Sequence, residues 1–438
     1  MKLAAAAAGC AAVAFALCTL APPRQTSGDT VAGRIGGAIL RCTGTFDLSR
    51  IDWLRSQTDQ HVELYYMHAD EDGEFTSAFG PAPAVIAAVA LLDFGSGATM
   101  TDATLRARER DAAAVLLALS VALLVLAAGA KADVAHAAGA GLVAALSFAG
   151  AATLGQGLWQ ATVALPALVG ALAAWCWSER FPRLRVVPPA LAALAVMLRP
   201  TLGPLALGLG VAWAAGKPSR RTWLVAGAIA VVAIAPLAVW NLVHLGTPLP
   251  VSQFDNNALI AEQEHAAAFS PSHVATALAA LVASPARGVL WFAPIALVGA
   301  IAGAKRERIV VAAIVLQWLA VATFFKWHGG MAYGPRLLAE AVWLAIWLAA
   351  RAWPERRGWR AVAWVAVAVT CLVGQLGLWS FRAEQWETRL GPDTHPGAVW
   401  NIVDSPIPAT LVPRDAPSSY DSPLRHELTC TGDMVRTR

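Results

Sequence analysis

Long apolar stretches alternate with short polar segments along the chain. An α-helix needs about 20 apolar residues to cross a bilayer, and the stretches have roughly that length. The first covers residues 4–21. The others lie at residues 81–97, 111–130, 134–152, 157–177, 188–216, 222–243, 286–303, 309–325, 336–352 and 361–380. This pattern predicts an all-α fold, a polytopic transmembrane bundle of about 11 spans.

The polar segments divide the chain into four parts. We expect a first transmembrane helix at 1–21, an outer loop at 22–80, the helical bundle at 81–380 and an external C-terminal tail at 381–438. A cleaved signal peptide is the alternative for the first stretch, and both interpretations deliver residue 22 to the outside. Acidic and basic residues alternate with aromatic residues in the outer loop. This composition predicts short amphipathic helices at the membrane interface.

Basic loops predict the orientation of the bundle. Three basic residues lie in the loop 305–308, and a second basic loop, 351–360, follows two spans later. Loops rich in Lys and Arg face the cytoplasm, so we expect both loops on that side. The loops 244–285 and 326–335 and the tail are then external, on the same side as the first outer loop.

The stretch 188–216 allows two topologies, because Arg199-Pro200 interrupts it and basic clusters flank it on both sides. A hairpin would keep both clusters inside and place Arg199 at an outer turn. The segment 81–97 would then be re-entrant or interfacial. A single crossing would instead make 81–97 a full span. Both alternatives give about 11 spans and an external C-terminus.

Composition supports an integral membrane protein. Apolar residues make up 57% of the 438 residues and charged residues 14%, against roughly 25% charged in soluble domains. This excludes an ordinary soluble enzyme, a disordered chain and a disulfide-dense secreted scaffold. The net charge of +4 lies in short loop clusters, so nucleic acid is not an expected partner. Arg outnumbers Lys in an Ala-rich chain, which favours a bacterial protein of the cytoplasmic membrane.

The six cysteines show no metal-binding spacing, and four of them lie in apolar runs, where a thiol is a small hydrophobe. Cys42 and Cys430 are the two thiols expected outside. We therefore hypothesise that a disulfide between them links the tail to the first outer loop.

Asp29 directly follows the first helix, on a glycine turn, and Arg34 lies five residues further on. A carboxylate at the membrane surface can act as a general base for an acceptor hydroxyl, or bind a cation. The alternative is a solvated residue that caps a helix over 31–40. Asp29 is the candidate catalytic residue, and Arg34 is a candidate substrate-binding residue.

Arg199 is a second candidate, because an arginine inside an apolar stretch is costly unless it faces a polar cavity or an anion. An internal salt bridge or a turn exposed to lipid headgroups is the alternative. His244 follows Trp240-Asn241 at the end of an apolar run. We count it, with Tyr65 and Tyr66 of the outer loop, among the candidate substrate-binding residues.

The loop 326–336 concentrates cations, a histidine, three glycines and aromatic rings at a membrane boundary. Glycine lets backbone approach a ligand, and arginine binds phosphate oxygens with two nitrogens. A plain interfacial turn is the alternative. The candidate substrate-binding residues of this loop are Lys326, His328, Tyr333 and Arg336.

Several segments, taken in order, resemble the GT-C class of polytopic membrane glycosyltransferases, which includes protein mannosyltransferases and lipid A aminoarabinose transferases. They look most like the uncharacterised bacterial branch, and the resemblance spans nearly the whole chain. The segments are SGDTVAGRIGGAILRCTGTFDL at 27–48, YY at 65–66 before SAFGPAPA at 77–84, GLWQ at 157–160, LRPT at 198–201, WNLVHLGTPL at 240–249, SPARGVLWFAP at 284–294 and KWHGGMAYGPRLLAE at 326–340.

The resemblance implies inverting transfer of a sugar from a polyprenyl-phosphate carrier to a glycan, lipid or protein acceptor. An acidic residue of the first outer loop serves as the base in the family, and Asp29 matches that position. Arg199, Lys326 and Arg336 match the basic residues that hold the lipid phosphate. Relatives often have a histidine where this chain has Ala161. That departure leaves open a drifted substrate, or a protein that binds the lipid without transferring its sugar.

Such a reaction needs only a base, cations on the leaving phosphate and a groove for the lipid, because the donor is already activated. The sequence offers all three. A divalent cation is the one cofactor left open, and no ligand cluster in the sequence calls for it. The alternatives are a transporter or flippase for a lipid-linked or anionic solute, or a non-catalytic GT-C-like subunit. Transporters tend to have internal repeats, and none is visible here.

Overall fold

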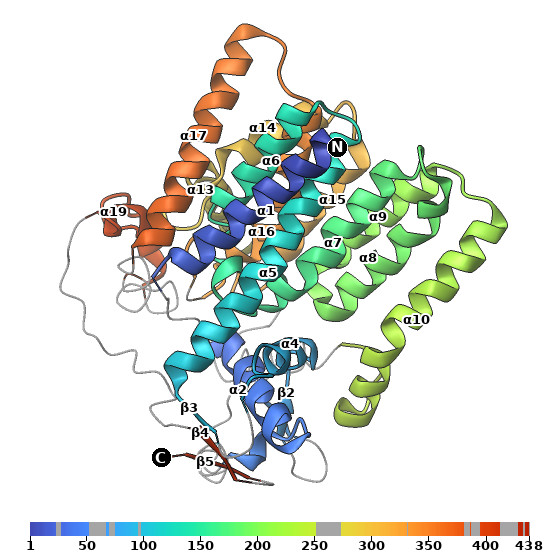
Figure 1. Ribbon diagram of the computed structural model, residues 1–438. Coiled ribbons are helices and arrows are strands. Elements are labelled where there is room, and N and C mark those ends of the chain that lie inside the picture. The colour runs from blue at the N-terminus through green and yellow to red at the C-terminus, as the bar shows by residue number, and fades with distance from the viewer. Residues whose placement is uncertain are drawn as a thin grey trace.

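The computed structural model describes residues 1–22, 28–51, 67–69, 75–94, 98–250, 273–330, 332–380, 386, 395–411, 428–431 and 434–437. These residues are mostly helical, as predicted (Figure 1). The helices of the bundle are α1 (Lys2–Leu20), α5 (Asp102–Gly129), α6 (Val134–Leu146), α7 (Gln160–Trp177), α8 (Val187–Leu198), α9 (Gly203–Ala215), α10 (Arg220–Leu245), α12 (Val274–Ala283), α13 (Val289–Phe292), α14 (Pro294–Gly303), α15 (Arg308–Thr323), α16 (Ala339–Arg351) and α17 (Arg357–Trp379).

Helix α16 lies at the centre of the bundle. Every residue from Ala339 to Ala350 is buried, and the indole of Trp343 donates a hydrogen bond to the carbonyl of Ala149 over 2.9 Å. Helix α14 packs closely on α16, because a Cβ at Gly299 would lie 1.9 Å from the carbonyl oxygen of Ala345. Small residues allow such close helix contacts in membrane bundles.

Five helices of the described residues are long and apolar enough to cross a membrane: α1, α5, α7, α10 and α17. Shorter apolar helices of 10–17 residues accompany them, among them α6, α12, α14 and α15. Together they support a membrane protein. The count of about 11 spans stays a prediction.

The stretch 188–216 is a helical hairpin, so the single-crossing alternative is wrong. Arg199 and the short 3₁₀ helix η4 (Pro200–Leu202) separate α8 from α9. Near the end of α9, the indole of Trp213 donates to the carbonyl of Arg185, just before α8, over 2.6 Å. The end of α8 and the start of α9 therefore meet at the Arg199 turn.

The segment 81–97 is not a full span. It contains α4 (Ala82–Ala90), a helix of nine residues that rises roughly 14 Å, about half of a bilayer core. Helix α4 packs against α2 (Gly28–Thr43) in the first outer loop. A Cβ at Gly37 would lie 2.4 Å from the Cβ of Ala87, so this packing depends on glycine in α2.

Other predicted boundaries need correction. The helix predicted at 111–130 begins at Asp102, because the hydroxyl of Thr101 caps it by accepting from the backbone amide of Thr104. The stretch 286–303 is broken at Ala293 into two helices. The predicted helix at 134–152 ends at Leu146, and turns follow.

The outer parts of the chain also contain strands, so the all-α prediction is incomplete. Strands β1 (Met67–Ala69) and β2 (Phe75–Ser77) pair antiparallel, with Met67 opposite Ser77. Three further strands form a second sheet in the order β3 (Thr99–Met100), β4 (Leu428–Thr431) and β5 (Met434–Thr437). The remaining short elements are the 3₁₀ helices η1 (Leu48–Arg50), η2 (Leu154–Gln156), η3 (Pro182–Val186), η6 (Arg336–Leu338) and η7 (Pro396–Trp400), and helix α19 (Pro406–Ala409).

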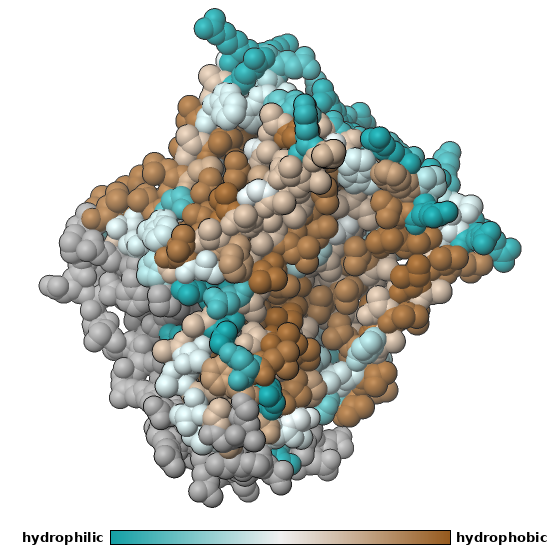
Figure 2. Space-filling view, viewed as in Figure 1, coloured by the Kyte–Doolittle hydropathy of each residue, from teal (hydrophilic) through white to brown (hydrophobic). Residues whose placement is uncertain are grey.

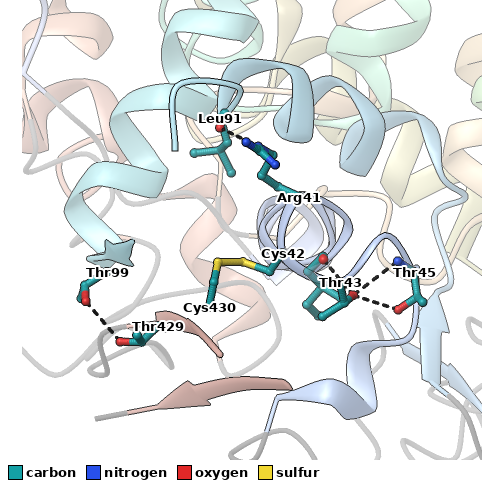
Figure 3. The surroundings of a disulfide bond; sticks show 9 residues. Arg41, Cys42, Thr43, Thr45, Leu91, Thr99, Thr429 and Cys430 are labelled. Atoms are coloured by element: carbon teal, nitrogen blue, oxygen red, sulfur yellow. Dashed lines mark hydrogen bonds between the residues drawn. A yellow bond between two sulfur atoms is a disulfide. The ribbon is translucent and has the colours of Figure 1, made fainter. Parts of the chain in front are cut away.

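The hypothesis of a disulfide between the tail and the first outer loop is confirmed. Cys42, near the end of α2, is bonded to Cys430 in β4, with their Cα atoms 5.4 Å apart (Figure 3). The pairing of β4 with β3 supports the same connection, and the hydroxyls of Thr99 and Thr429 are hydrogen-bonded beside it. The disulfide and the sheet together fix the end of the tail to the outer segment.

The loops that we predict to be cytoplasmic lie together at one end of the bundle. Lys131 pairs with Glu179, and Arg351 pairs with Glu307. Figure 2 shows hydrophilic residues gathered near the start of α17 and at the turn between α9 and α10, with hydrophobic residues over the flanks between the two ends. The candidate site lies at the opposite end.

Candidate functional site

Asp29 and Arg336 form an ion pair, although 307 positions separate them in the sequence. Asp29 lies in the first turn of α2, and Arg336 begins η6, directly before the central helix α16. Their side chains are 27% and 11% exposed. The structure thus brings the candidate base together with a candidate phosphate-binding residue, at a position that a ligand can reach.

Arg336 is held on two further sides. Its Nη2 donates to the carbonyl of Gly329 over 2.6 Å, and its guanidinium lies 4.3 Å from the ring centroid of Trp159, a distance suited to a cation–π contact. The indole of Trp159 in turn donates to the carbonyl of Thr153 over 3.2 Å. The Nε of Arg336 is buried and has no hydrogen-bond partner within the described part of the chain. Such an atom is a donor ready for an incoming anion.

Arg199 forms a second, buried ion pair beside the first. Its Nη1 lies 2.6 Å from Oε1 of Glu340, and its Nε donates to the hydroxyl of Thr201 over 2.9 Å. Arg199 also interacts electrostatically with Asp29 and Arg336. The result is a cluster of two arginines and two carboxylates, and the internal salt bridge considered from the sequence is present.

Glu340 belongs to this cluster and was not among the residues singled out from the sequence. It lies at the start of α16 and is 1% exposed. The signal that could have identified Glu340 is the one that identified Arg199, a charge at the edge of an apolar run. Its position four residues after Arg336 places both residues on the same side of the helix start.

Arg34 lies in a buried framework next to the site. Its Nη1 is 2.8 Å from Oε2 of Glu109, and its Nη2 is 3.5 Å from Asp102. The other oxygen of Glu109 accepts from the backbone amide of Leu158 over 3.0 Å. This connection links α2, which carries Asp29, to the segment that carries Trp159. A direct contact of Arg34 with substrate stays a prediction.

The other candidates of the loop 326–336 contribute to its internal structure. Tyr333 is 4% exposed, and its hydroxyl donates to the carbonyl of Val373 over 2.9 Å. His328 is 4% exposed, and its Nδ1 lies 3.3 Å from the amide of Gly330. The ammonium of Lys326 lies 5.4 Å from the ring of Phe325. Their roles toward a substrate stay predictions.

His244 lies in an aromatic cluster near the outer end of α10. Its ring is 4.8 Å from that of Trp240 and 6.2 Å from that of Phe46, which follows α2. The cluster therefore connects the first outer segment to α10. Tyr65 and Tyr66 lie outside the described residues.

A small hollow lies near the charged cluster. Apolar side chains from the α4 entry, the end of α8 and the outer half of α10 line it, including Phe79, Met197 and Leu237, together with the amides of Gln160 and Asn241. Gln160 follows Trp159 in sequence, and the lining residue Pro200 follows Arg199. The lining of the hollow is therefore continuous along the chain with Arg199 and with Trp159, the residue against which Arg336 lies.

The described residues contain no group of three or more His, Cys, Asp or Glu side chains that could hold a metal ion. A divalent cation at Asp29 stays a prediction. The chemistry that these residues themselves support is anion binding by two arginines and proton acceptance by one accessible carboxylate.

No protein-family model and no curated protein matches the chain. Among solved structures, the chain is similar to the Archaeoglobus fulgidus oligosaccharyltransferase, in a crystal structure of its complex with Zn and sulfate. The TM-score is 0.43 and the sequence identity 16%. The alignment covers 94% of this chain and 59% of that chain, so this chain spans about three fifths of the oligosaccharyltransferase's length.

Proposed function

We propose that the protein is a GT-C-like membrane glycosyltransferase. It moves a sugar from a polyprenyl-phosphate-linked donor to a glycan, lipid or protein acceptor on the outer face of a bacterial cytoplasmic membrane. The observation that carries this proposal is the pairing of the accessible Asp29 carboxylate with Arg336 beside an apolar hollow. A base, a phosphate-binding cation and a place for a lipid are then adjacent.

Asp29 serves as the general base in this proposal. Its carboxylate accepts the proton of the acceptor hydroxyl while the hydroxyl oxygen attacks the anomeric carbon of the sugar. The bond from that carbon to the phosphate oxygen breaks, and its electron pair leaves with the polyprenyl phosphate. One displacement inverts the anomeric centre. A carboxylate has about four acceptor positions, so Asp29 can accept this proton while it remains paired with Arg336.

Arg336 stabilises the leaving phosphate. Its Nε has no hydrogen-bond partner among the described residues, and its planar guanidinium is suited to bind two phosphate oxygens. Trp159 fixes the plane of the guanidinium from one face. Donors that are already oriented toward developing negative charge contribute strongly to catalysis. Arg199, which is paired with Glu340, adds positive potential to the same place.

The hollow receives the lipid next to the phosphate. Apolar side chains in its lining, such as Met197 and Leu237, suit contact with the start of an isoprenoid chain. The side-chain oxygens of Gln160 and Asn241 can accept from hydroxyls of the sugar, while Nε2 of Gln160 donates to the carbonyl of Phe79 over 3.1 Å. Helix α10, which lines one side of the hollow, is exposed over most of its surface. Lipid can reach the hollow along this helix.

The test is transfer of radiolabelled sugar from a panel of polyprenyl-phosphate donors in membranes that contain wild type or Asp29→Asn. Asp133→Asn is the matched control, because Asp133 is also an aspartate at the start of a helix, the N-cap of α6, but lies at the opposite end. We expect label from wild type and the control, and a loss of at least about 100-fold in Asp29→Asn. No transfer by wild type with any donor would contradict the proposal and favour a transporter or non-catalytic role.

A further inference from the structure

Arg287 is a buried arginine that the proposed reaction does not use. It lies on the turn between α12 and α13, and it is 0% exposed. The hydroxyl of Ser284 shapes this turn by accepting from the backbone amide of Arg287 over 2.9 Å. A wholly buried guanidinium is costly, so its contacts define what it does.

The guanidinium of Arg287 binds the loop that carries Arg336. Its Nε donates to the carbonyl of His328 over 2.8 Å, and its Nη2 donates to the carbonyl of Gly330 over 3.1 Å. The carbonyl between them, that of Gly329, accepts from Nη2 of Arg336. Three successive carbonyls are therefore held by two guanidinium groups.

The backbone of this loop requires both glycines. Gly329 has φ of +81° and Gly330 has φ of +60°, in the left-handed region that side chains disfavour. In this conformation the carbonyls of His328 and Gly330 accept from Arg287, and the carbonyl of Gly329 accepts from Arg336. The planar fork of an arginine side chain can bind two carbonyls at once. The ammonium of a lysine, as a single point charge, lacks this fixed fork.

The tail covers the same arginine. The ring of Trp386 lies 5.6 Å from Cζ of Arg287, and the side chain of Trp386 is buried. The indole of Trp386 donates to the carbonyl of Asp404 over 2.8 Å, and the amide of Ala286 approaches the carbonyl of Val399 at 3.4 Å. Arg287 thus lies between the tail and the loop of the site.

We propose that Arg287 is a positioning residue for the transfer reaction. It holds the backbone of residues 328–330 so that Arg336 lies against Trp159, beside Asp29 and the leaving phosphate. This inference rests on the proposed function. In it, Arg287 acts entirely through Arg336. Misplacement of a catalytic group by about 1 Å can lower a rate by about 100-fold.

The test is a double-mutant cycle between Arg287→Gln and Arg336→Ala, measured as kcat/KM for sugar transfer. We expect Arg287→Gln to lower kcat/KM by about 100-fold in the wild-type background and by less than about threefold in the Arg336→Ala background. Arg287→Lys should recover part of the loss. Arg306→Gln is the matched control, since Arg306 donates to a backbone carbonyl, that of Arg351, at the opposite end. Effects of Arg287→Gln that are equal in both backgrounds would overturn the proposal.

Hydrogen exchange of the full-length protein provides a readout that does not depend on activity. In Arg287→Gln and in Arg287→Lys, amides of residues 326–336 should exchange at least about tenfold faster, while those of α5 stay unchanged. If wild type transfers no sugar but the loop amides exchange faster in the Arg287 variants, the proposed function is contradicted and the positioning contact is supported. Unchanged exchange in the loop, with transfer intact, would overturn the role of Arg287 alone.

Discussion

Ion pairs occur at both ends of the bundle, but they differ in how far they are buried. At the end with the basic loops, the side chains of Lys131 and Glu179 are 29% and 75% exposed, and those of Arg351 and Glu307 are 21% and 14% exposed. At the other end, those of Arg199 and Glu340 are 8% and 1% exposed. Exposed pairs contribute little to stability, whereas buried charges are costly and need a compensating role. The comparison favours a ligand site at the second end.

The two ends also differ in how their charges are connected. At the first end, Lys131 and Glu179 are 48 positions apart in the sequence, and Glu307 and Arg351 are 44 positions apart. At the second end, Asp29 from the start of the chain meets Arg336 from its last third, and Arg199 from the middle lies beside both. Convergence of distant segments on one charged cluster is the arrangement that a binding site requires.

We expect the largest loss of stability from substitutions in the Arg199–Glu340 pair. Arg199→Leu or Glu340→Leu alone should destabilise the protein by about 3–5 kcal/mol, because each leaves an unpaired buried charge. The double variant should regain most of that stability, since no charge is left. Thermal unfolding of the purified protein measures both effects. If the double variant transfers sugar at the wild-type rate, Arg199 has only a structural role.

Loss of the disulfide comes next. Replacement of Cys42 and Cys430 by serine should lower stability by about 2–4 kcal/mol, because the bond closes a very long loop of chain. Unfolding curves of wild type with and without reductant should reproduce the difference. Labelling of both thiols in non-reduced protein would rule out the bond.

Arg336 should affect binding more than stability. Arg336→Ala should weaken the affinity for polyprenyl phosphate by about 10–100-fold, the effect of one charged hydrogen-bond donor. Arg336→Lys keeps the charge but loses the fork and the stacking on Trp159, so it should be intermediate. Arg306→Ala at the opposite end is the control. Equal affinity for wild type and Arg336→Ala would contradict a phosphate-binding role.

We expect the smallest effect on stability from the Lys131–Glu179 pair, at the end with the basic loops. The hydrogen bond and charge of Lys131 lower the pKa of Glu179 below its ordinary value of 4.5. The pair therefore stabilises the protein above about pH 4.5, and the contribution is lost as the pH falls through the lowered pKa. Lys131→Met should change stability by less than about 0.5 kcal/mol at pH 7. A larger loss would remove the contrast between the two ends.

The sequence was sufficient to predict the helical bundle and to single out Asp29, Arg199 and Arg336, which the structure brings into one charged cluster. Their roles toward a substrate stay predictions. The bundle and each of the three residues are marked by a local signal, a long apolar run or a charge at the edge of one. The pairing of Cys42 with Cys430 followed from the predicted topology. The hairpin at 188–216 could not be decided, because both topologies placed the late basic loops on the same side.

Other features depend on partners that are distant in the sequence. Glu109 was not singled out from the sequence, and Arg287 appeared only as part of the SPARGVLWFAP segment. The fold reveals that Glu109 accepts from the amide of Leu158 and that Arg287 donates to carbonyls of the 326–336 loop. Strands β3 and β4 have two and four residues. Such short strands give no period-two pattern and exist only because they pair with each other.

The most direct test of the central claim exchanges the two members of the site pair. The double variant Asp29→Arg with Arg336→Asp restores opposite charges at the same two positions, so a purely structural ion pair would function again. The account predicts wild-type thermal stability but no sugar transfer, because the base and the phosphate-binding cation have exchanged places. Recovery of transfer in this double variant, relative to each single variant, would contradict the account.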